Sequence, residues 1–317
     1  TNSNGTTGDR FEFNLSILND ATISTVTIMW SHGNSSGNIN LNLSETNYFG
    51  IRRWCGSIFL HDDLGNLTYN VSVIDNSGKY ILNNKRTVNV RDNDRPLFGT
   101  KWNSTVTTGD SALFTINITE NIGVDQLMFN FIINRGQSFN WSVNNNTENM
   151  WSITIVIPDN AFSFEYYFWV NDTSNNQNKT ISDILSVVDN DIPFIISDDT
   201  DSTGTTGEPL TFSTHFSDNI GLDPAKVYVI WFYDFGENPL TSSMSYLGQY
   251  AWQFTIGAVR PNATVIYYGF LIYDISGNSY STDPMNPGIV TISDNDKPIF
   301  GREETIGLPT TGDPYTI

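Results

Sequence analysis

The sequence contains a single cysteine, Cys55, so the chain cannot form an internal disulfide bond. Its domains must therefore be held together by side-chain packing, and a bound metal ion is the remaining kind of cross-link. Cys55 stands next to Trp54, and we expect it to be a small buried hydrophobic side chain.

Positive charge is also scarce: 15 Lys and Arg residues stand against 34 Asp and Glu residues, which gives a formal net charge of −19. Nucleic acids and anionic lipids are attracted by Lys and Arg, so this balance disfavours both as partners, and cations are the expected counter-partners. No run of 18 apolar residues occurs, and residues 1–10 resemble no signal peptide. We therefore expect no membrane insertion within this segment.

Sustained helical periodicity is missing as well, and turn residues interrupt the chain every 8–12 positions, which is typical of an antiparallel sandwich. Two motifs recur with a period of about 100 residues, the size of one immunoglobulin-like (Ig-like) sandwich domain. Thr-Thr-Gly-Asp/Glu occurs at 6–9, 107–110, 205–208 and 310–313, and Asp-Asn-Asp-x-Pro occurs at 92–96, 189–193 and 294–298. The predicted fold is all-β, with three tandem Ig-like β-sandwich domains at 1–94, 95–191 and 192–296, followed by an orphan strand at 297–317.

Aromatic and acidic residues also return at matching places in each repeat. A Trp, a Tyr and a strand-ending Asp follow one another as Trp54, Tyr69 and Asp75, as Trp151, Tyr166 and Asp172, and as Trp252, Tyr268 and Asp274. We expect the Trp and Tyr side chains to fill the core between the two sheets of each domain. The residues after each Asp are hairpin-turn residues, because Gly and Asn tolerate positive φ.

The linkers VRDNDRPLF, VVDNDIPFI and ISDNDKPIF resemble the Asp-rich, Pro-terminated linkers between cadherin repeats. Together with the TTGD, DNIG and D-x-SGN patterns they resemble tandem Ig-like repeats of archaeal surface proteins, over the whole chain. This resemblance implies an extracellular protein of the cell surface, in a surface layer (S-layer), an adhesin or a filament. The chain departs from cadherins because it lacks their Asp-Arg-Glu motif.

In an Ig-type sandwich, a linker enters the next domain at the end where two of its loops converge, so acidic residues far apart in sequence should meet there. For domain 2 this candidate metal set is Asp92, Asp94, Glu120, Asp125 and Asp172, and for domain 3 it is Asp189, Asp191, Asp218, Asp223 and Asp274. Carboxylates and loop carbonyls suit the six to eight oxygen ligands of Ca²⁺. In the alternative interpretation these residues only form Asx turns at strand ends.

Asn-x-Ser/Thr sequons are numerous and support an extracellular location. Besides Asn4, the candidate glycosylation sites are Asn14, Asn34, Asn42, Asn66, Asn70, Asn103, Asn117, Asn140, Asn145, Asn171, Asn178 and Asn262. Part of this set is expected by chance in a chain so rich in Asn, Ser and Thr.

Catalytic patterns are not apparent. His32, His61 and His215 stand in non-equivalent places without metal-ligand or triad spacing, so we do not expect an enzyme. The predicted function is structural: a rod-like segment of a surface layer or filament with calcium-stiffened junctions. The alternative is a cell-surface adhesin or carbohydrate-binding module, in which one domain should deviate from the others.

Copies of the chain itself are the expected partners, besides glycans or other cells. Domain 1 lacks the strand that its siblings have at about 96–106 and 193–204, whereas residues 297–309 have the character of such a strand. Head-to-tail assembly by strand donation, or continuation of the chain, would complete domain 1.

Overall fold

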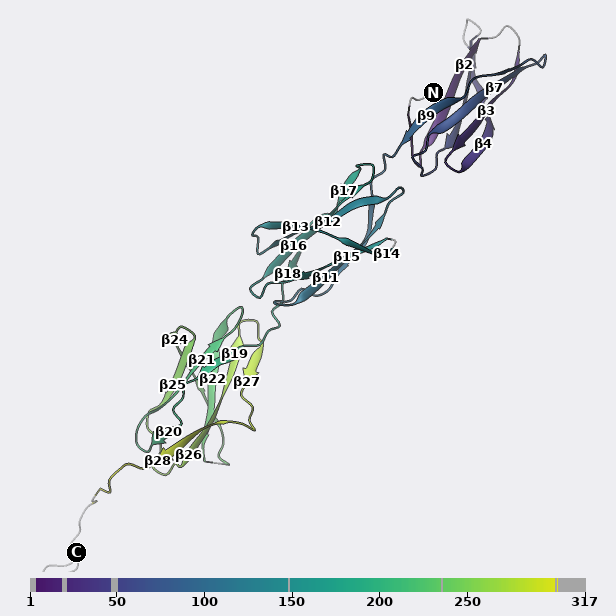
Figure 1. The fold of residues 1–317 in the computed structure, drawn as a ribbon. Helices are drawn as coiled ribbons and strands as arrows, with labels where there is room; N and C mark the ends of the chain where they lie inside the picture. Colours follow the sequence, from purple (N-terminus) through teal and green to yellow (C-terminus); the bar gives the residue numbers. More distant parts are fainter. Residues whose placement is uncertain are drawn as a thin grey trace, which may run out of the picture. The chain divides into compact units, whose positions relative to one another are not determined.

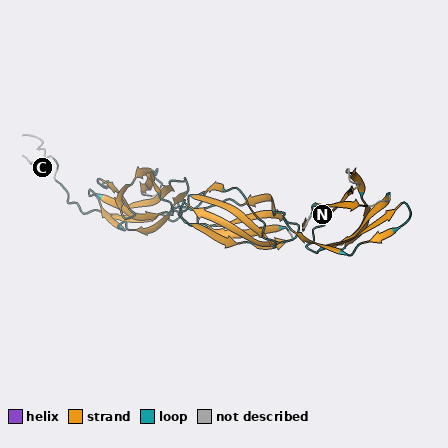
Figure 2. Cartoon of the chain, turned by 90° about the horizontal axis from the view of Figure 1, so that it is seen from above, coloured by secondary structure: helices purple, strands orange, loops and turns teal. Residues whose placement is uncertain are grey.

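The computed structural model describes residues 4–18, 22–46, 51–147, 149–234, 236–299 and 301. Within these residues the regular elements are all β-strands, joined by loops and turns, and none is a helix, as Figure 2 shows. The strands form pairs of facing sheets in three Ig-like sandwiches (Figure 1), which confirms the predicted all-β fold. In the same residues no helix is long and apolar enough to cross a membrane.

Domain 1 has a larger and a smaller sheet. The larger sheet has the order β1 (Asn4–Thr6), β9 (Arg86–Arg91), β7 (Leu67–Asp75), β3 (Ile23–His32) and β4 (Ser35–Asn40), with β8 (Tyr80–Leu82) also paired to β7. The smaller sheet has the order β2 (Arg10–Leu18), β6 (Ile51–Phe59) and β5 (Asn42–Thr46).

Domain 2 has a similar arrangement, with an isolated bridge between Thr107 and Val188 in place of the pairing of β1 and with one more strand in its second sheet. The first sheet has the order β13 (Ser138–Ser142), β12 (Val124–Ile133), β16 (Ser163–Asp172) and β17 (Gln177–Lys179), with β18 (Asp183–Ser186) also paired to β16. The second sheet has the order β10 (Leu97–Asn103), β11 (Ser111–Thr119), β15 (Met150–Val156) and β14 (Asn144–Thr147).

Domain 3 follows the same plan. Its first sheet has the order β20 (Thr203–Thr205), β28 (Gly288–Ser293), β26 (Val265–Asp274), β22 (Leu222–Tyr233) and β23 (Leu240–Ser243), with β27 (Ser279–Ser281) also paired to β26. Its second sheet has the order β19 (Phe194–Asp198), β21 (Leu210–Ser217), β25 (Ala251–Ile256) and β24 (Ser245–Gly248).

Each sandwich has a hydrophobic core of its own, built by alternation along its strands. In β26, for example, Ile266, Tyr268, Phe270 and Ile272 are buried while the residues between them are half-buried. The repeated Tyr is buried in all three domains, and the repeated Trp is buried in domains 1 and 3 and half-buried in domain 2. These aromatic side chains therefore contribute to the cores of the domains, as predicted.

Cys55 differs from its prediction, because it is only half-buried. Trp54 faces the core of domain 1, and successive side chains of a strand point to opposite faces, so Cys55 lies on the outer face of β6.

The two repeat motifs contact each other, which explains why both recur. In the Thr-Thr-Gly turn the first Thr donates to the following acid, as in Thr6 Oγ1 to Asp9 Oδ2 at 2.6 Å. The second Thr is buried and donates to the linker, as in Thr7 Oγ1 to Asp92 Oδ1 at 3.0 Å, and Thr206 Oγ1 to Asp294 Oδ1 at 3.1 Å. The turn glycines have φ between +65° and +80°, a region that other residues rarely adopt.

Strand β2 pairs with β6 alone among the described residues, whereas the corresponding strands β11 and β21 are also paired with β10 and β19. The strand predicted at 297–317 lies outside the described residues apart from 297–299 and 301, which form no strand. Backbone contacts divide the chain into two compact units, residues 1–157 with 161–188, and residues 158–160 with 189–317. The predicted boundaries between the three domains, at residues 94 and 191, therefore remain predictions.

Candidate metal centres

Two groups of three acidic residues could each hold a metal ion. Asp92, Glu120 and Asp172 form the first group, and Asp189, Asp218 and Asp274 form the second. In each group one carboxylate oxygen per residue lies within 4.8 Å of the others. The three residues come from the linker, from the loop after β11 or β21, and from the end of the central strand β16 or β26. The predicted convergence of these three segments is therefore present in both units.

The strand-ending aspartates Asp172 and Asp274 also hold their own turns, and both are fully buried. Asp172 Oδ1 accepts hydrogen bonds from the amides of Ser174 and Asn176, both at 2.8 Å, and Asp274 Oδ1 does the same for Gly277 and Asn278. The Asx-turn interpretation therefore holds for these two residues. It does not exclude the metal interpretation, because a carboxylate oxygen has more than one lone pair.

The loop acids Glu120 and Asp218 accept backbone hydrogen bonds in the same way. Asp218 Oδ1 accepts from Ile220 N at 2.9 Å and Gly221 N at 2.7 Å. Its other oxygen, Oδ2, is inaccessible to solvent and has no hydrogen-bond partner. A buried carboxylate oxygen without a partner is costly, and a cation is the ligand that would satisfy it.

The candidate metal sets predicted from the sequence do not include two further asparagines, Asn121 and Asn219, whose buried side-chain oxygens are of a kind that cations bind. Asn121 Nδ2 donates to Asp94 Oδ2 at 2.9 Å, and Asn219 Nδ2 donates to Asp191 Oδ2 at 2.8 Å. In both residues the amide oxygen is buried and has no hydrogen-bond donor. Side-chain amide oxygens are ordinary Ca²⁺ ligands. The repeated Asn-Ile-Gly was the signal that could have identified these residues.

Not every predicted ligand joins a group. Asp94 and Asp191 are not members of the groups but accept the hydrogen bonds from Asn121 and Asn219. Burial raises the pKa of Asp94, and repulsion from Asp92 raises it further. Asp125 and Asp223 are not brought into either group. Asp125 is the extra residue of a β-bulge between Val124 and Gln126, which leaves it exposed.

Asp223 has other partners. Its carboxylate accepts from Ala225 N at 3.0 Å and forms an ion pair with Lys226 at 3.1 Å, and these contacts lower its pKa. The preceding Leu222 packs against the core of domain 3, and successive side chains of a strand point to opposite faces, so Asp223 lies on the outer face of β22.

Burial raises the pKa of Glu120 and of Asp218, and repulsion from neighbouring carboxylates adds to the increase. In the folded metal-free protein, Glu120 and Asp218 therefore keep their protons to higher pH than in the unfolded chain. The difference applies at pH values between the ordinary carboxyl pKa of about 4 and the raised pKa values of these two residues. The stability of the metal-free protein should fall as pH rises through that window. Ca²⁺ favours the charged carboxylates, so its stabilising effect should increase over the same window.

We expect the Ca²⁺-induced increase in melting temperature to be small near pH 4 and to grow towards pH 7, in calorimetric scans with Ca²⁺ and with chelator. The double variant Glu120→Gln, Asp218→Asn should lose this dependence. A Ca²⁺ effect of the same size at every pH would contradict the assignment of these two carboxylates.

The histidines do not join any candidate metal group of the described residues. His32 is buried with Nε2 at 3.0 Å from the carbonyl oxygen of Asp63. His215 Nδ1 lies 2.8 Å from Asp199 Oδ2 and 3.2 Å from Ser197 Oγ. A Ser-His-Asp triad uses opposite ring nitrogens for its Ser and Asp, so this group lacks the geometry of a nucleophilic site.

The candidate glycosylation sites divide by exposure. The exposed ones are Asn4, Asn14, Asn34, Asn42, Asn66, Asn117, Asn140, Asn145 and Asn262. Asn70, Asn103 and Asn178 are half-buried, and each donates its amide to a backbone carbonyl. Asn171 is only 8% exposed because it lies opposite the bulge in β12, so folded protein has no room for a glycan there.

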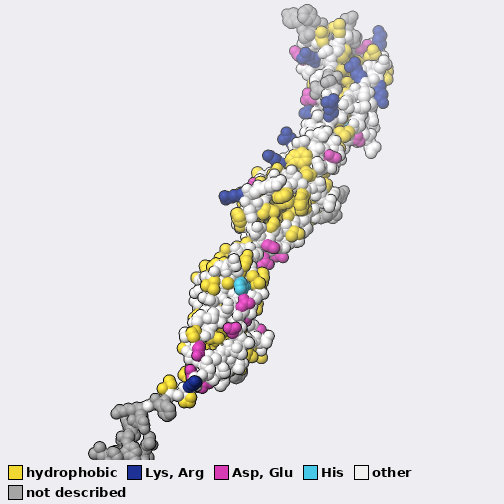
Figure 3. All heavy atoms as spheres, turned by 60° about the vertical axis from the view of Figure 1, so that its left-hand side comes forward, with side chains coloured by type: hydrophobic (Ala, Val, Ile, Leu, Met, Phe, Trp, Pro, Cys, Tyr) yellow, Lys and Arg dark blue, Asp and Glu magenta, His cyan; other side chains and the backbone are white. Residues whose placement is uncertain are grey.

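Charge is unevenly distributed along the chain. On the face shown in Figure 3, Lys and Arg side chains gather mainly on domain 1. Between residues 192 and 296 only Lys226 and Arg260 are basic, against twelve acidic residues. Domain 3 is therefore strongly acidic and suited to cations and neutral ligands.

No model of a known protein family matches the chain, and no curated protein matches it. Among solved structures, the D1–D4 ectodomain fragment of ICAM-5 is similar over 92% of this chain and 74% of its own, with 8% identity and a TM-score of 0.45. A tetra-tandem repeat from the extending region of a large adhesion protein is similar over 88% and 70%, with 16% identity and a TM-score of 0.35. Extracellular domains 3–5 of Drosophila OTK are similar over 92% and 93%, with 11% identity and a TM-score of 0.32. Likeness at this level concerns the fold alone, a tandem of Ig-like β-sandwiches.

Proposed function

We propose that this chain is a structural segment of an extracellular surface layer or filament, and that Ca²⁺ stiffens the junctions between its domains. The observation that carries the proposal is the same acidic group built twice, each time from one linker residue and two residues of the domain that the linker enters. An ion bound there would tie the linker to that domain. Without it, the carboxylates of the group repel one another.

The first linker has contacts on both sides that an ion would reinforce. Thr7 of domain 1 donates to Asp92, and Asn176 Nδ2 of domain 2 lies 3.3 Å from Asp92 Oδ2. Asn121 of domain 2 also donates towards Thr7 Oγ1, at 3.3 Å. The linker between β9 and β10 is thus bonded to both domains of this unit, and a cation on Asp92 would add an ionic bond to that set.

Assembly with further copies of the chain belongs to the same proposal. Its support is the edge of β2 that has no strand beside it among the described residues, at the position where β10 and β19 pair in the other domains. An unpaired edge is a template for strand addition. The exposed sequons and the acidic surface suit an extracellular location.

The proposal is tested by titrating chelator-treated protein with Ca²⁺ in a calorimeter. We expect two sites per chain, with dissociation constants of about 10⁻⁴–10⁻³ M, as in extracellular modules. Asp92→Asn should remove one site and Asp189→Asn the other, while the matched control Asp125→Asn should keep both.

Small-angle scattering of the same samples measures the flexibility of the junctions. Ca²⁺ should narrow the distribution of interatomic distances in the wild type. In the double variant Asp92→Asn, Asp189→Asn, this distribution should not change when Ca²⁺ is added. Protein that takes up no Ca²⁺ and scatters identically with and without chelator would leave these aspartates as turn formers only.

A further inference from the structure

A cavity of about 370 Å³ opens in domain 3 beside the hairpin of β24 and β25. Four aromatic residues line it: Phe216 and Trp252 are buried, whereas Tyr246 and Tyr250 are 58% and 57% exposed. Tyr246 lies opposite Trp252 across the two strands, and their ring centroids are 4.9 Å apart. A volume of about 300–1,000 Å³ with aromatic walls is typical of small-ligand sites.

This aromatic lining is peculiar to domain 3. The residue paired with the repeated Trp is Tyr246 here, but Asn145 in domain 2 and Leu43 in domain 1. Tyr250 corresponds to Asn149 of domain 2. The carbonyl of Tyr250 accepts a hydrogen bond from Phe216 N of β21, and the carbonyl of Asn149 accepts one from Ile118 N of the matching strand β11. Since domain 2 forms the same sandwich with Asn at both places, the two tyrosines are not required by the fold.

The turn that carries Tyr250 holds it in an unfavourable backbone conformation. Gln249 and Tyr250 have φ values of +51° and +69°, a left-handed region in which Gly and Asn are preferred over bulky residues. Backbone strain of this kind is concentrated at functional sites. Here it presents an exposed ring at the rim of the cavity.

Polar groups and charge indicate the class of ligand. Ser217 lines the same cavity, and its hydroxyl group can exchange hydrogen bonds with the hydroxyl groups of a ligand. The twelve acidic and two basic residues of domain 3 oppose anionic ligands. Flat aromatic faces beside a hydroxyl group suit a neutral ring with an apolar face and hydroxyl groups at its edge.

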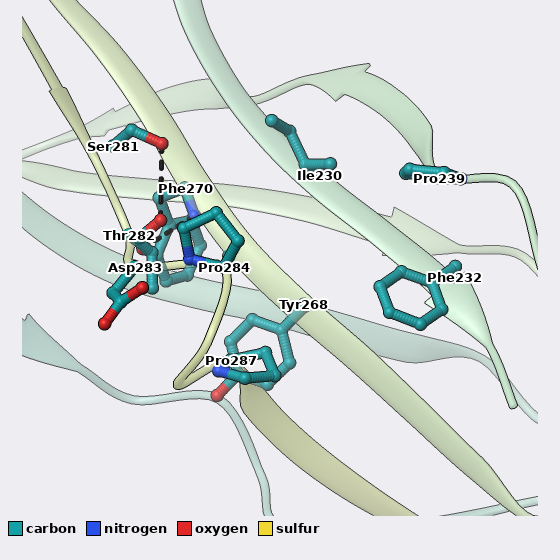
Figure 4. A pocket seen from close by; sticks show the side chains of 11 residues that line it. Ile230, Phe232, Pro239, Tyr268, Phe270, Ser281, Thr282, Asp283, Pro284 and Pro287 are labelled. Atoms are coloured by element: carbon teal, nitrogen blue, oxygen red, sulfur yellow. Dashed lines mark hydrogen bonds between the residues drawn. The ribbon is translucent and has the colours of Figure 1, made fainter. Parts of the chain in front are cut away.

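Another cavity of domain 3, of about 240 Å³, has no exposed aromatic ring in its wall. It lies over β22 and β26 and is lined by Ile230, Phe232 and three prolines (Figure 4). Ser281 Oγ donates to the carbonyl of Thr282, and Thr282 Oγ1 accepts from Phe270 N, so hydroxyl groups at its wall are already used within the domain.

We propose that the cavity beside β24 and β25 binds a pyranose ring of a neutral oligosaccharide. The ring stacks on Tyr246 and Tyr250, and a hydroxyl group at its edge bonds to Ser217. Asp218 at the cavity wall belongs to the second acidic group, but the two tyrosines do not, so their substitution separates sugar binding from Ca²⁺ binding.

The test is calorimetric titration of the whole 317-residue chain with cellohexaose, laminarihexaose, mannohexaose and chitohexaose, and with the hexamer of galacturonic acid as the anionic comparison. At least one neutral hexaose should bind saturably, and the acidic hexamer should not. The variant Tyr246→Asn, Tyr250→Asn copies domain 2, and we expect at least about a tenfold loss of affinity, as for aromatic anchors of binding sites. Its melting temperature should not fall, because Asn suits the turn, and its Ca²⁺ response should stay unchanged.

Tyr80→Ala is the control, since Tyr80 of domain 1 is 59% exposed and lies outside the cavity. It should bind as the wild type does. N-glycans released from the protein itself form a second set of ligands, and their binding would identify other copies of the chain as the source of the sugar. The proposal fails if no neutral oligosaccharide binds, if the double variant binds as well as the wild type, or if the tyrosines only drive self-association in sedimentation velocity.

Discussion

Replacing Asp172 or Asp274 with Ala should lower the free energy of unfolding of its domain by about 3 kcal/mol, because each fully buried carboxylate satisfies several donors of its own turn. The same substitution removes a ligand of the acidic group. We therefore expect both a lower melting temperature in chelator and the loss of one Ca²⁺ site, in calorimetric scans and titrations.

Substitution with Asn separates these two effects. Asp172→Asn and Asp274→Asn keep an acceptor oxygen for the backbone donors of the turn, but they lose the oxygen that accepts from Asn176 or Asn278. The stability in chelator should therefore fall less than in the Ala variants, while Ca²⁺ binding is lost as completely. Asp75 in domain 1 is the matched control, because it accepts from Ser77 and Lys79 in the equivalent turn but belongs to no candidate metal group. Each of the three Asn variants creates a sequon, so the proteins are to be made in a host without N-glycosylation.

Asp75→Asn should leave the Ca²⁺ response of the chain unchanged. If Asp172→Asn and Asp274→Asn also leave it unchanged, these residues are turn formers and the ions do not bind there. The proposed function would then lose its main support, whereas the sugar site of domain 3 would be unaffected.

Phe129→Ala should destabilise domain 2 by about 3–5 kcal/mol, as expected for deletion of a fully buried aromatic side chain. Phe129 is 0% exposed and has ring contacts with Phe114, Phe131, Phe164, Tyr166 and Phe168. Because domain 3 has a separate core in a separate unit, its own unfolding transition should stay in place. Calorimetric scans should therefore show one transition moved to lower temperature and one retained.

The matched control is Phe139→Ala, since Phe139 also stacks on Phe131 but is 41% exposed. Phe139→Ala should lower the free energy of unfolding of domain 2 by much less than Phe129→Ala, because it removes little buried area and leaves no cavity in the core. A single transition that moves as a whole in Phe129→Ala would show that the domains unfold together and that their cores are not independent.

The fold class, the repeated elements and the aromatic residues of the cores could be predicted from the amino-acid sequence. Its motifs recur in the same order about every 100 residues, and alternation along a strand decides which side chains face the core. The strand-ending Asp172 and Asp274 and the linker residues Asp92 and Asp189 could therefore be predicted to converge, and the structure brings them into the two acidic groups.

The places where that alternation is interrupted, and the polar groups that remain unpaired, depend on contacts between strands and could not be predicted from the sequence. The bulge in β12 turns Asp125 outwards and buries Asn171, which no local pattern indicates because the bulge depends on pairing with β16. The unpaired oxygens of Asn121 and Asn219 and the cavity beside Tyr246 also arise from contacts between segments far apart in sequence. A sequence specifies side chains one at a time, whereas a binding site depends on which of them meet and on which groups are left without a partner.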